Sequence, residues 1–192
     1  MESTNTSDLE PFYAYGAELA DIEAVMRLSA VKRWHMLDTS RSQTLAEHSA
    51  NVAMLAYLIA MKAPAMYFGP ATFVGMAALV HDIGEVFSGD TPTPTKNYGT
   101  SIRAVIKQLE NRLTPEFFKL SCDRYTTLMI KMCDLADGIR FIRLHGIDIT
   151  SRHAREGLER QLKKCYDDME PWPPEVRRHV SSHTQFYAYE QS

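Results

Sequence analysis

The fold is decided by residues 71–87, ATFVGMAALVHDIGEVF, which follow Pro70. The first ten residues of this stretch are apolar or small apart from one threonine, and the pattern predicts a buried helix that begins near the proline. The pair His81-Asp82 stands where the pattern should stay hydrophobic. Burying an imidazole and a carboxylate side by side is costly unless they are paired or bound to a metal. The pair is therefore the first candidate for chemistry.

The rest of the chain also has helical patterns, and no stretch alternates in the way that predicts a strand. A capping box at Thr44 to Glu47 predicts the start of a helix that stops before Pro64. Gly146 predicts a helix end. We expect an all-α fold with helices at 18–30, 44–62, 70–87, 101–113, 115–121, 124–145, 151–168 and 174–190.

One long irregular stretch interrupts the helices at residues 88–100, SGDTPTPTKNYGT. Its prolines and glycines preclude regular structure. A loop of this length inside a compact helical domain is often functional. We expect residues 88–99 to act as a lid over a bound substrate.

Composition predicts one ordinary folded domain. The 192 residues are 45% hydrophobic and carry a net charge of −3, which argues against a nucleic-acid polymer as partner. Three cysteines without a C-x-x-C pair, a polar acidic start and the lack of an apolar run of about 18 residues favour a cytoplasmic protein with no membrane segment. We expect a flexible tail at 1–10 and a single domain at 11–192.

Two further side chains in other predicted helices are also candidates for metal binding. His48 lies one turn into its predicted helix, and Asp134 interrupts an apolar run inside the helix 124–145. By itself an HD dipeptide is weak evidence of a metal site, and a lone His48 is more often a capping or core residue. Two imidazoles and two carboxylates from three helices form a mixed set that suits Zn²⁺, Mn²⁺, Co²⁺ or Fe²⁺.

The order of these four residues resembles the HD superfamily of phosphohydrolases. Arg33-Trp34 before the first histidine, the AEHS sequence at 46–49 and the stretch HDIGEVFSGDTPTPTK at 81–96 make the resemblance closer. Over residues 30 to 140 the chain resembles the bacterial 5′-deoxyribonucleotidases and their phage relatives, the dATP triphosphohydrolases. The resemblance implies a compact HD-domain helical bundle that hydrolyses a small 2′-deoxynucleotide.

The resemblance also implies a role for each motif residue. One divalent ion (Zn²⁺, Co²⁺ or Mn²⁺) would be held by His48, His81, Asp82 and Asp134. Glu85 would position or deprotonate the attacking water, and it lies one helical turn after the first residue of the HD pair. Asp90 matches the acid near the leaving 5′-oxygen. A magnesium ion bound together with the substrate phosphates stays open.

Four more positions would contact the substrate. Arg33 and Lys96 match cationic contacts to phosphate, and Trp34 matches a residue that packs on the sugar and disfavours a 2′-hydroxyl. Met36 matches a base-pocket residue by position alone. No histidine lies between the HD pair and the last aspartate, whereas two-metal HD phosphodiesterases need additional ones there. We therefore expect a single metal ion.

Several alternatives stay open at this stage. The substrate is dATP, releasing deoxyadenosine and triphosphate, or a deoxynucleoside monophosphate, and a non-catalytic nucleotide sensor is a third reading. Asp137 is a partner of a metal ligand or a surface acid. The pair His179 and His183 is interpreted as incidental, the run 152–164 as a solvated face, and Cys133 as structural. A homo-oligomer, dimer or hexamer, is expected from the resemblance.

Overall fold

A computed structural model describes residues 22, 24–92 and 100–190. These residues are helical apart from loops and one short strand pair, which confirms the all-α prediction. The predicted tail at 1–10 and Lys96 lie outside the described residues. The helices are α2 (Leu45–Lys62), α3 (Ala65–Phe68), α4 (Ala71–Leu79), α5 (Glu85–Ser88), α7 (Thr100–Leu113), α8 (Arg124–His145), α9 (Ile149–Asp168) and α10 (Pro174–Tyr189), with a 3₁₀ turn, η2 (Glu116–Phe118).

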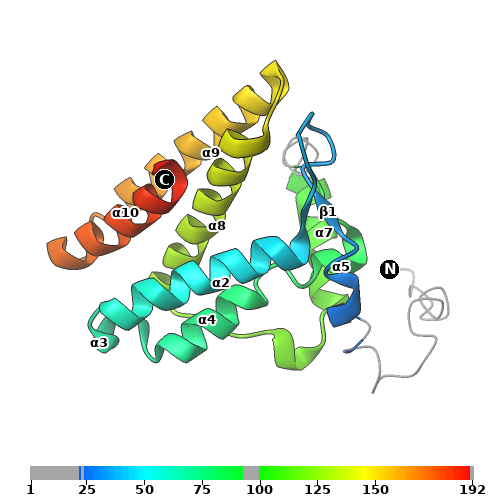
Figure 1. The fold of residues 1–192 in the computed structure, drawn as a ribbon. Coiled ribbons are helices and arrows are strands. Elements are labelled where there is room, and N and C mark those ends of the chain that lie inside the picture. Colours follow the sequence, from blue (N-terminus) through cyan, green and yellow to red (C-terminus); the bar gives the residue numbers. More distant parts are fainter. Residues whose placement is uncertain (1–21, 23, 93–99, 191–192) are drawn as a thin grey trace.

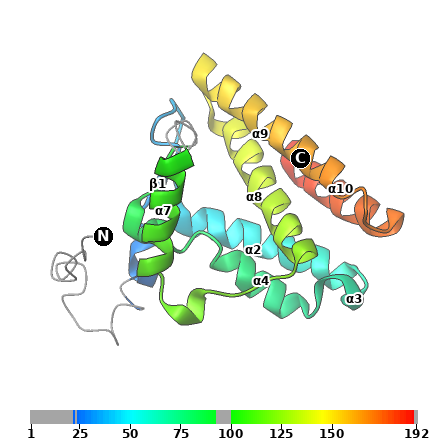
Figure 2. The same ribbon diagram turned by 180° about the vertical axis from the view of Figure 1, so that it is seen from behind.

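Helix α8 is the centre of the arrangement (Figure 1). It crosses α2 and α4, which pack on each other, and it lies beside α9 and α10. Helices α5 and α7 form a second group on the opposite side of the molecule, which is also clear from behind in Figure 2. The main core fills the space between α2, α4, α8 and α10, and its fully buried side chains include Val52, Ile59, Val74, Met129, Ile139 and Val180.

The prediction of one continuous helix over 70–87 is wrong. Helix α4 ends at Leu79, and α5 begins only at Glu85. The turn between them has tight i to i+3 hydrogen bonds, such as that from the Ile83 amide to the Val80 carbonyl at 3.1 Å. Likewise, the helix predicted at 115–121 is only the single turn η2.

Only one of the two hydrogen bonds of the predicted capping box is present at the start of α2. The Thr44 hydroxyl accepts a hydrogen bond from the Glu47 amide at 3.0 Å, as predicted. The Glu47 carboxylate, however, is bound by the Arg41 guanidinium at 2.6 and 2.8 Å. Glu47 precedes His48 in the sequence, but its carboxylate is therefore held at the surface by Arg41.

A two-residue antiparallel pair precedes α2. Strand β1 (Lys32–Arg33) lies beside β2 (Gln43–Thr44), with Arg33 opposite Gln43. The pair carries Arg33 and the following Trp34 to the first turns of α2 and to α8.

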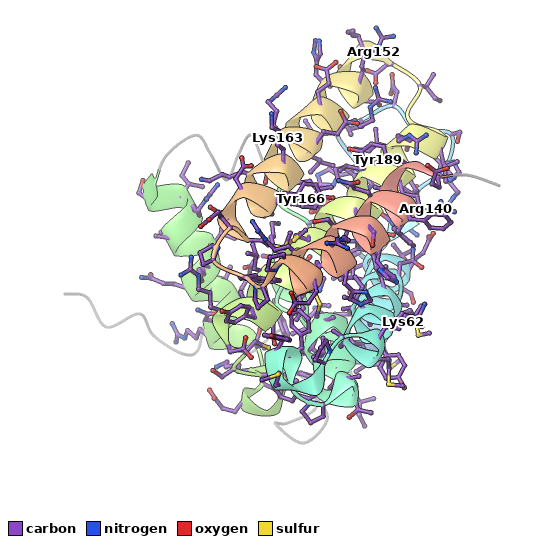
Figure 3. The ribbon with its side chains drawn as sticks, turned by 90° about the vertical axis from the view of Figure 1, so that its left-hand side faces the viewer. Lys62, Arg140, Arg152, Lys163, Tyr166 and Tyr189 are labelled. Carbon is purple, nitrogen blue, oxygen red and sulfur yellow. The ribbon has the colours of Figure 1, made fainter. Side chains whose placement is uncertain are left out.

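The run 152–164 is a solvated face, as predicted. Arg152 and Lys163 are exposed on α9 and point away from the bundle in Figure 3. Arg155 lies 3.5 Å from Glu159, one turn further along the same helix. Charges of both signs alternate here, so this face is not a basic patch for nucleic acid.

Candidate metal centre

The four predicted metal ligands lie together. His48 comes from α2, His81 and Asp82 from the turn after α4, and Asp134 from α8. One donor atom from each lies within 4.8 Å of the others. His48 Nε2 is 3.3 Å from Asp134 Oδ1, and His81 Nε2 is 3.2 Å from Asp82 Oδ2.

The break between α4 and α5 allows the HD pair to converge. Neighbouring residues on a regular helix point about 100° apart and do not face a common point. Because the helix stops at Leu79, His81 and Asp82 lie in a tight turn and reach the same side. The turn packs closely on α7, since a Cβ added at Gly84 would lie 2.8 Å from Glu110 Cβ.

Both histidines are held with one nitrogen directed at the cluster. His48 Nδ1 donates to Asp137 Oδ2 at 2.7 Å, and His81 Nδ1 donates to the Ala78 carbonyl at 2.7 Å. Each Nε2 is buried and makes no hydrogen bond to the described residues. Fixing the tautomer through the other ring nitrogen is the usual arrangement of a metal-binding histidine. The set of two nitrogens and two carboxylates therefore fits a divalent transition metal ion.

Asp137 hydrogen-bonds His48, one of the four predicted metal ligands, which favours the interpretation of Asp137 as the partner of a ligand over that of a surface acid. Its carboxylate is buried and accepts four hydrogen bonds. The donors are His48 Nδ1 and Gln43 Nε2 to one oxygen, and Asn51 Nδ2 and Tyr187 Oη to the other, at 2.7 to 2.9 Å. Burial would raise the pKa of Asp137, but these hydrogen bonds, above all that from the histidine, hold it below its usual range.

The Arg33 guanidinium is a largely buried cation that lies beside two of the four predicted ligands. Its Nη1 is 3.2 Å from Asp82 Oδ2 and 4.0 Å from Glu85 Oε2, and its Nη2 is 3.8 Å from Asp134 Oδ1. Burial would lower the pKa of Arg33, but these carboxylates and Asp90 raise it. The Arg33 guanidinium therefore stays positively charged, and its planar group of N–H donors is suited to binding a phosphate at this place.

The remaining predicted residues surround this centre. Glu85 is buried and lines the same cavity as the HD pair, although it stands in a separate helix. Asp90 accepts a hydrogen bond at 3.3 Å from the backbone amide of Trp34, whose φ of 61° is unusual for a bulky residue. Met36 is 69% exposed beyond it. The structure thus brings the described candidates other than Met36 to one region.

An open cavity of about 760 Å³ adjoins the cluster. Its walls include His81, Asp82 and Glu85, together with Lys107 and Lys119. The space is far larger than one phosphate group requires.

Two residues of this region were missed in the sequence. Lys131 Nζ is 2.6 Å from Asp134 Oδ2, and the carboxylate raises the pKa of this lysine. The i, i+3 spacing of a cation before the last aspartate was the available signal. Gln43 is 1% exposed and bonds both Trp34 and Asp137. Nothing in the sequence distinguishes it from a surface glutamine.

Binding of a divalent ion is expected to release protons. Burial would lower the pKa of His81, but Asp82 beside it and Asp134 raise it to about 9. This histidine is therefore mostly protonated at pH 7.5 without metal, and it must lose its proton to coordinate. Each proton released makes Kd rise about tenfold per pH unit as pH falls.

Calorimetry of Zn²⁺ binding in two buffers with different ionisation enthalpies measures this release. We expect at least one proton per ion at pH 7.5. Equal binding enthalpies in the two buffers, after correction for zinc–buffer complexes, would contradict the protonated state of His81 before the ion binds.

The all-α bundle and the cluster of one histidine, an adjacent histidine–aspartate pair and a last aspartate are the arrangement of an HD domain. The family model for 5′-deoxynucleotidase YfbR-like proteins matches residues 22–132, more than half of the chain. The chain therefore belongs to the YfbR-like family.

Individual relatives divide into two kinds. A 5′-deoxynucleotidase of Pasteurella multocida is 34% identical over 87 residues, which are 44% of this chain and only 45% of that protein. The dATP triphosphohydrolases of Salmonella phage PMBT28 and Cyanophage S-2L are each 28% identical, over 77% and 72% of this chain and 78% and 79% of their own lengths. The solved structure of the Cyanophage S-2L HD phosphohydrolase DatZ, bound to dA and one catalytic Zn²⁺ ion, has a TM-score of 0.74 at 23% identity. The superposed region covers 85% of this chain and 93% of the DatZ chain.

Three further observations concern membrane helices, the cysteines and the second histidine pair. None of the described helices combines the length and apolarity needed to cross a membrane. All three cysteines are free, and Cys133 is fully buried, where burial and Asp134 raise its thiol pKa. His179 and His183 bond backbone carbonyls at 3.0 and 2.8 Å, and no third ligand lies with them among the described residues.

Proposed function

We propose that the protein hydrolyses the 5′-phosphate ester of a 2′-deoxynucleotide, with dATP as the substrate and deoxyadenosine and triphosphate as products. The observation that carries this proposal is the cluster of His48, His81, Asp82 and Asp134, with Glu85 and Arg33 beside it. These four side chains would hold one divalent ion. When bound, such an ion lowers the pKa of water and polarises a phosphoryl oxygen.

The chain's own groups divide the remaining chemistry. Glu85 accepts a proton from the water that attacks the phosphorus next to the sugar, and the bond from phosphorus to the 5′-oxygen breaks. Asp90 is the group that gives a proton to that leaving oxygen. Arg33 and Lys131 offset the negative charge that builds on the phosphoryl oxygens. Lys96 would contribute a further charge; it lies outside the described residues, as does most of the segment 88–99 that the sequence predicts as a lid.

A long phosphate chain is favoured by the space on one side of the centre. Trp34 packs against Gly138, after Asp134 in α8, whereas the cavity reaches Thr127 before it. Because a helix rises about 1.5 Å per residue, the metal centre lies along α8 between the far wall of the cavity and Trp34, several ångströms from each. A deoxynucleoside against Trp34 would direct its phosphates toward Lys107 and the rest of the cavity.

The monophosphate is the second candidate substrate, because the family model and the bacterial relatives are named for it. A product assay separates the two. Purified protein with added Zn²⁺, Co²⁺ or Mn²⁺ is incubated with dATP, dAMP and ATP, and the products are separated by ion-exchange chromatography. We expect triphosphate from dATP, little turnover of dAMP and about a hundredfold lower kcat/KM for ATP, if Trp34 excludes the 2′-hydroxyl.

Orthophosphate from dAMP without turnover of dATP would identify a monophosphate nucleotidase. Turnover that survives complete metal removal would overturn the mechanism. Equal turnover of ATP and dATP would remove the sugar role from Trp34.

We propose further that the protein acts in the cytoplasm as a homo-oligomer, a dimer or a hexamer. Free cysteines support the compartment. Met54, Leu58 and Met61 support the assembly, because they form a stripe on the outer side of α2 and are 59, 45 and 58% exposed. Light scattering coupled to gel filtration measures the mass, and a monomer at micromolar concentration would contradict the assembly.

A further inference from the structure

A chain of hydrogen bonds joins Trp34 to the metal ligand His48. The indole Nε1 donates to Gln43 Oε1 at 2.8 Å, and Gln43 Nε2 donates to Asp137 Oδ2 at 2.8 Å. The same Oδ2 accepts from His48 Nδ1 at 2.7 Å. Gln43, Asp137 and His48 are 1, 2 and 0% exposed. Water therefore does not compete for these bonds.

The other ring contacts of Trp34, which include the Arg33 guanidinium 5.4 Å from the ring centroid, do not fix the ring within its own plane. The indole packs flat beside Phe141 at 6.5 Å between centroids, and Gly138 allows close approach, since an added Cβ there would lie 3.2 Å from the ring. Flat packing permits sliding in the plane of the ring. The Nε1–H is the ring's one polar group, so its bond to Gln43 sets where the ring stops.

We propose that Gln43 is a positioning residue that couples Trp34, on the substrate side, to the metal centre. A carboxamide accepts from the indole through one atom and donates to Asp137 through the other, and its planar group is rigid. A shift of His48 on binding an ion therefore passes through Asp137 and Gln43 to the indole. By linkage, substrate held against Trp34 strengthens ion binding by the same factor. The inference rests on the metal centre proposed above.

The two tryptophans of the chain make the coupling visible. In ¹⁵N-labelled protein, two indole N–H resonances are expected, and Trp34→Phe assigns one of them. Titration with Zn²⁺ should move the Trp34 resonance up to one equivalent of metal. Gln43→Leu should abolish this response, and it should raise both the Kd for Zn²⁺ and the KM for dATP by about tenfold, the lower end of effects seen for partners of metal ligands.

Asn51→Leu is the matched control. Asn51 Nδ2 donates to the other oxygen of Asp137 at 2.9 Å, so its loss also weakens the support of His48. We expect weaker Zn²⁺ binding in this variant, while the Trp34 response to the metal and the KM for dATP remain those of the wild type. If Asn51→Leu and Gln43→Leu lose the response and raise KM alike, Gln43 has only a structural role and the proposal is wrong.

Gln43→Met serves if the leucine variant does not fold. Its side chain has nearly the same length but cannot donate to Asp137, so the Trp34 resonance should stop responding to Zn²⁺. A response of wild-type size in that variant would contradict the coupling. The wild-type titration decides the rest: if no Zn²⁺ binds, the metal centre fails, whereas Zn²⁺ binding without movement of the Trp34 resonance overturns the coupling alone.

Discussion

Asp134→Ala is expected to lose the metal ion and to lower kcat/KM by at least about a thousandfold, because metal-assisted charge stabilisation contributes several kcal/mol. The aspartate supplies one of four donors, and it lies 3.3 Å from His48 and 3.8 Å from Arg33. Without its charge, the ion is bound by three groups, and Arg33 and Lys131 lose their shared partner. Metal content by mass spectrometry and steady-state kinetics with dATP measure the two effects.

Asp167→Ala is the control for this substitution, because it removes an exposed carboxylate of α9 that is not part of the ligand cluster. It should retain stoichiometric metal and wild-type kinetics. The assignment of Asp134 is contradicted if its alanine variant binds metal and turns over dATP as the wild type does.

Glu85→Gln is expected to lower kcat by about 10² to 10⁴, the usual contribution of a general base, while metal content stays unchanged. The amide keeps the size of the buried side chain but cannot accept the proton of the attacking water. The pair of measurements distinguishes a proton acceptor from a metal ligand, because a ligand variant loses both the ion and the rate.

Glu47→Gln is the matched control for Glu85. This glutamate precedes His48 in the motif, but its carboxylate is held by Arg41 at the surface. Its variant should keep kcat within about twofold, as surface changes away from the site do. A full-rate Glu85→Gln enzyme would remove Glu85 from the mechanism.

The sequence was a good guide where local signals decide the structure. Helix α8 begins and ends as predicted, at Arg124 and His145. Its Asp123 cap bonds the Thr126 amide at 2.8 Å, and Gly146 follows its end. The proximity of the four predicted ligands was also predictable, because charged and imidazole groups in apolar helices stand out against the pattern.

Tertiary contacts decided what the sequence did not reveal. Every residue of 71–87 is compatible with a helix, and the break at 80–84 depends on packing against α7 and on convergence of the HD pair. The partners of Asp137 are just as remote: Gln43 and His48 lie 94 and 89 residues away in sequence. Neither spacing nor propensity indicates such contacts.

Three segments that are distant in the chain supply the ligands, and this has a consequence for the lifetime of the protein. An ion held there crosslinks α2, the turn after α4 and α8, and it can do so only in the folded chain. Free ion at a hundred times its Kd would then add about 2.7 kcal/mol to the free energy of unfolding. The supply of transition metal in the cell would thus govern resistance to proteolysis as well as turnover, and metal-starved molecules would be degraded first.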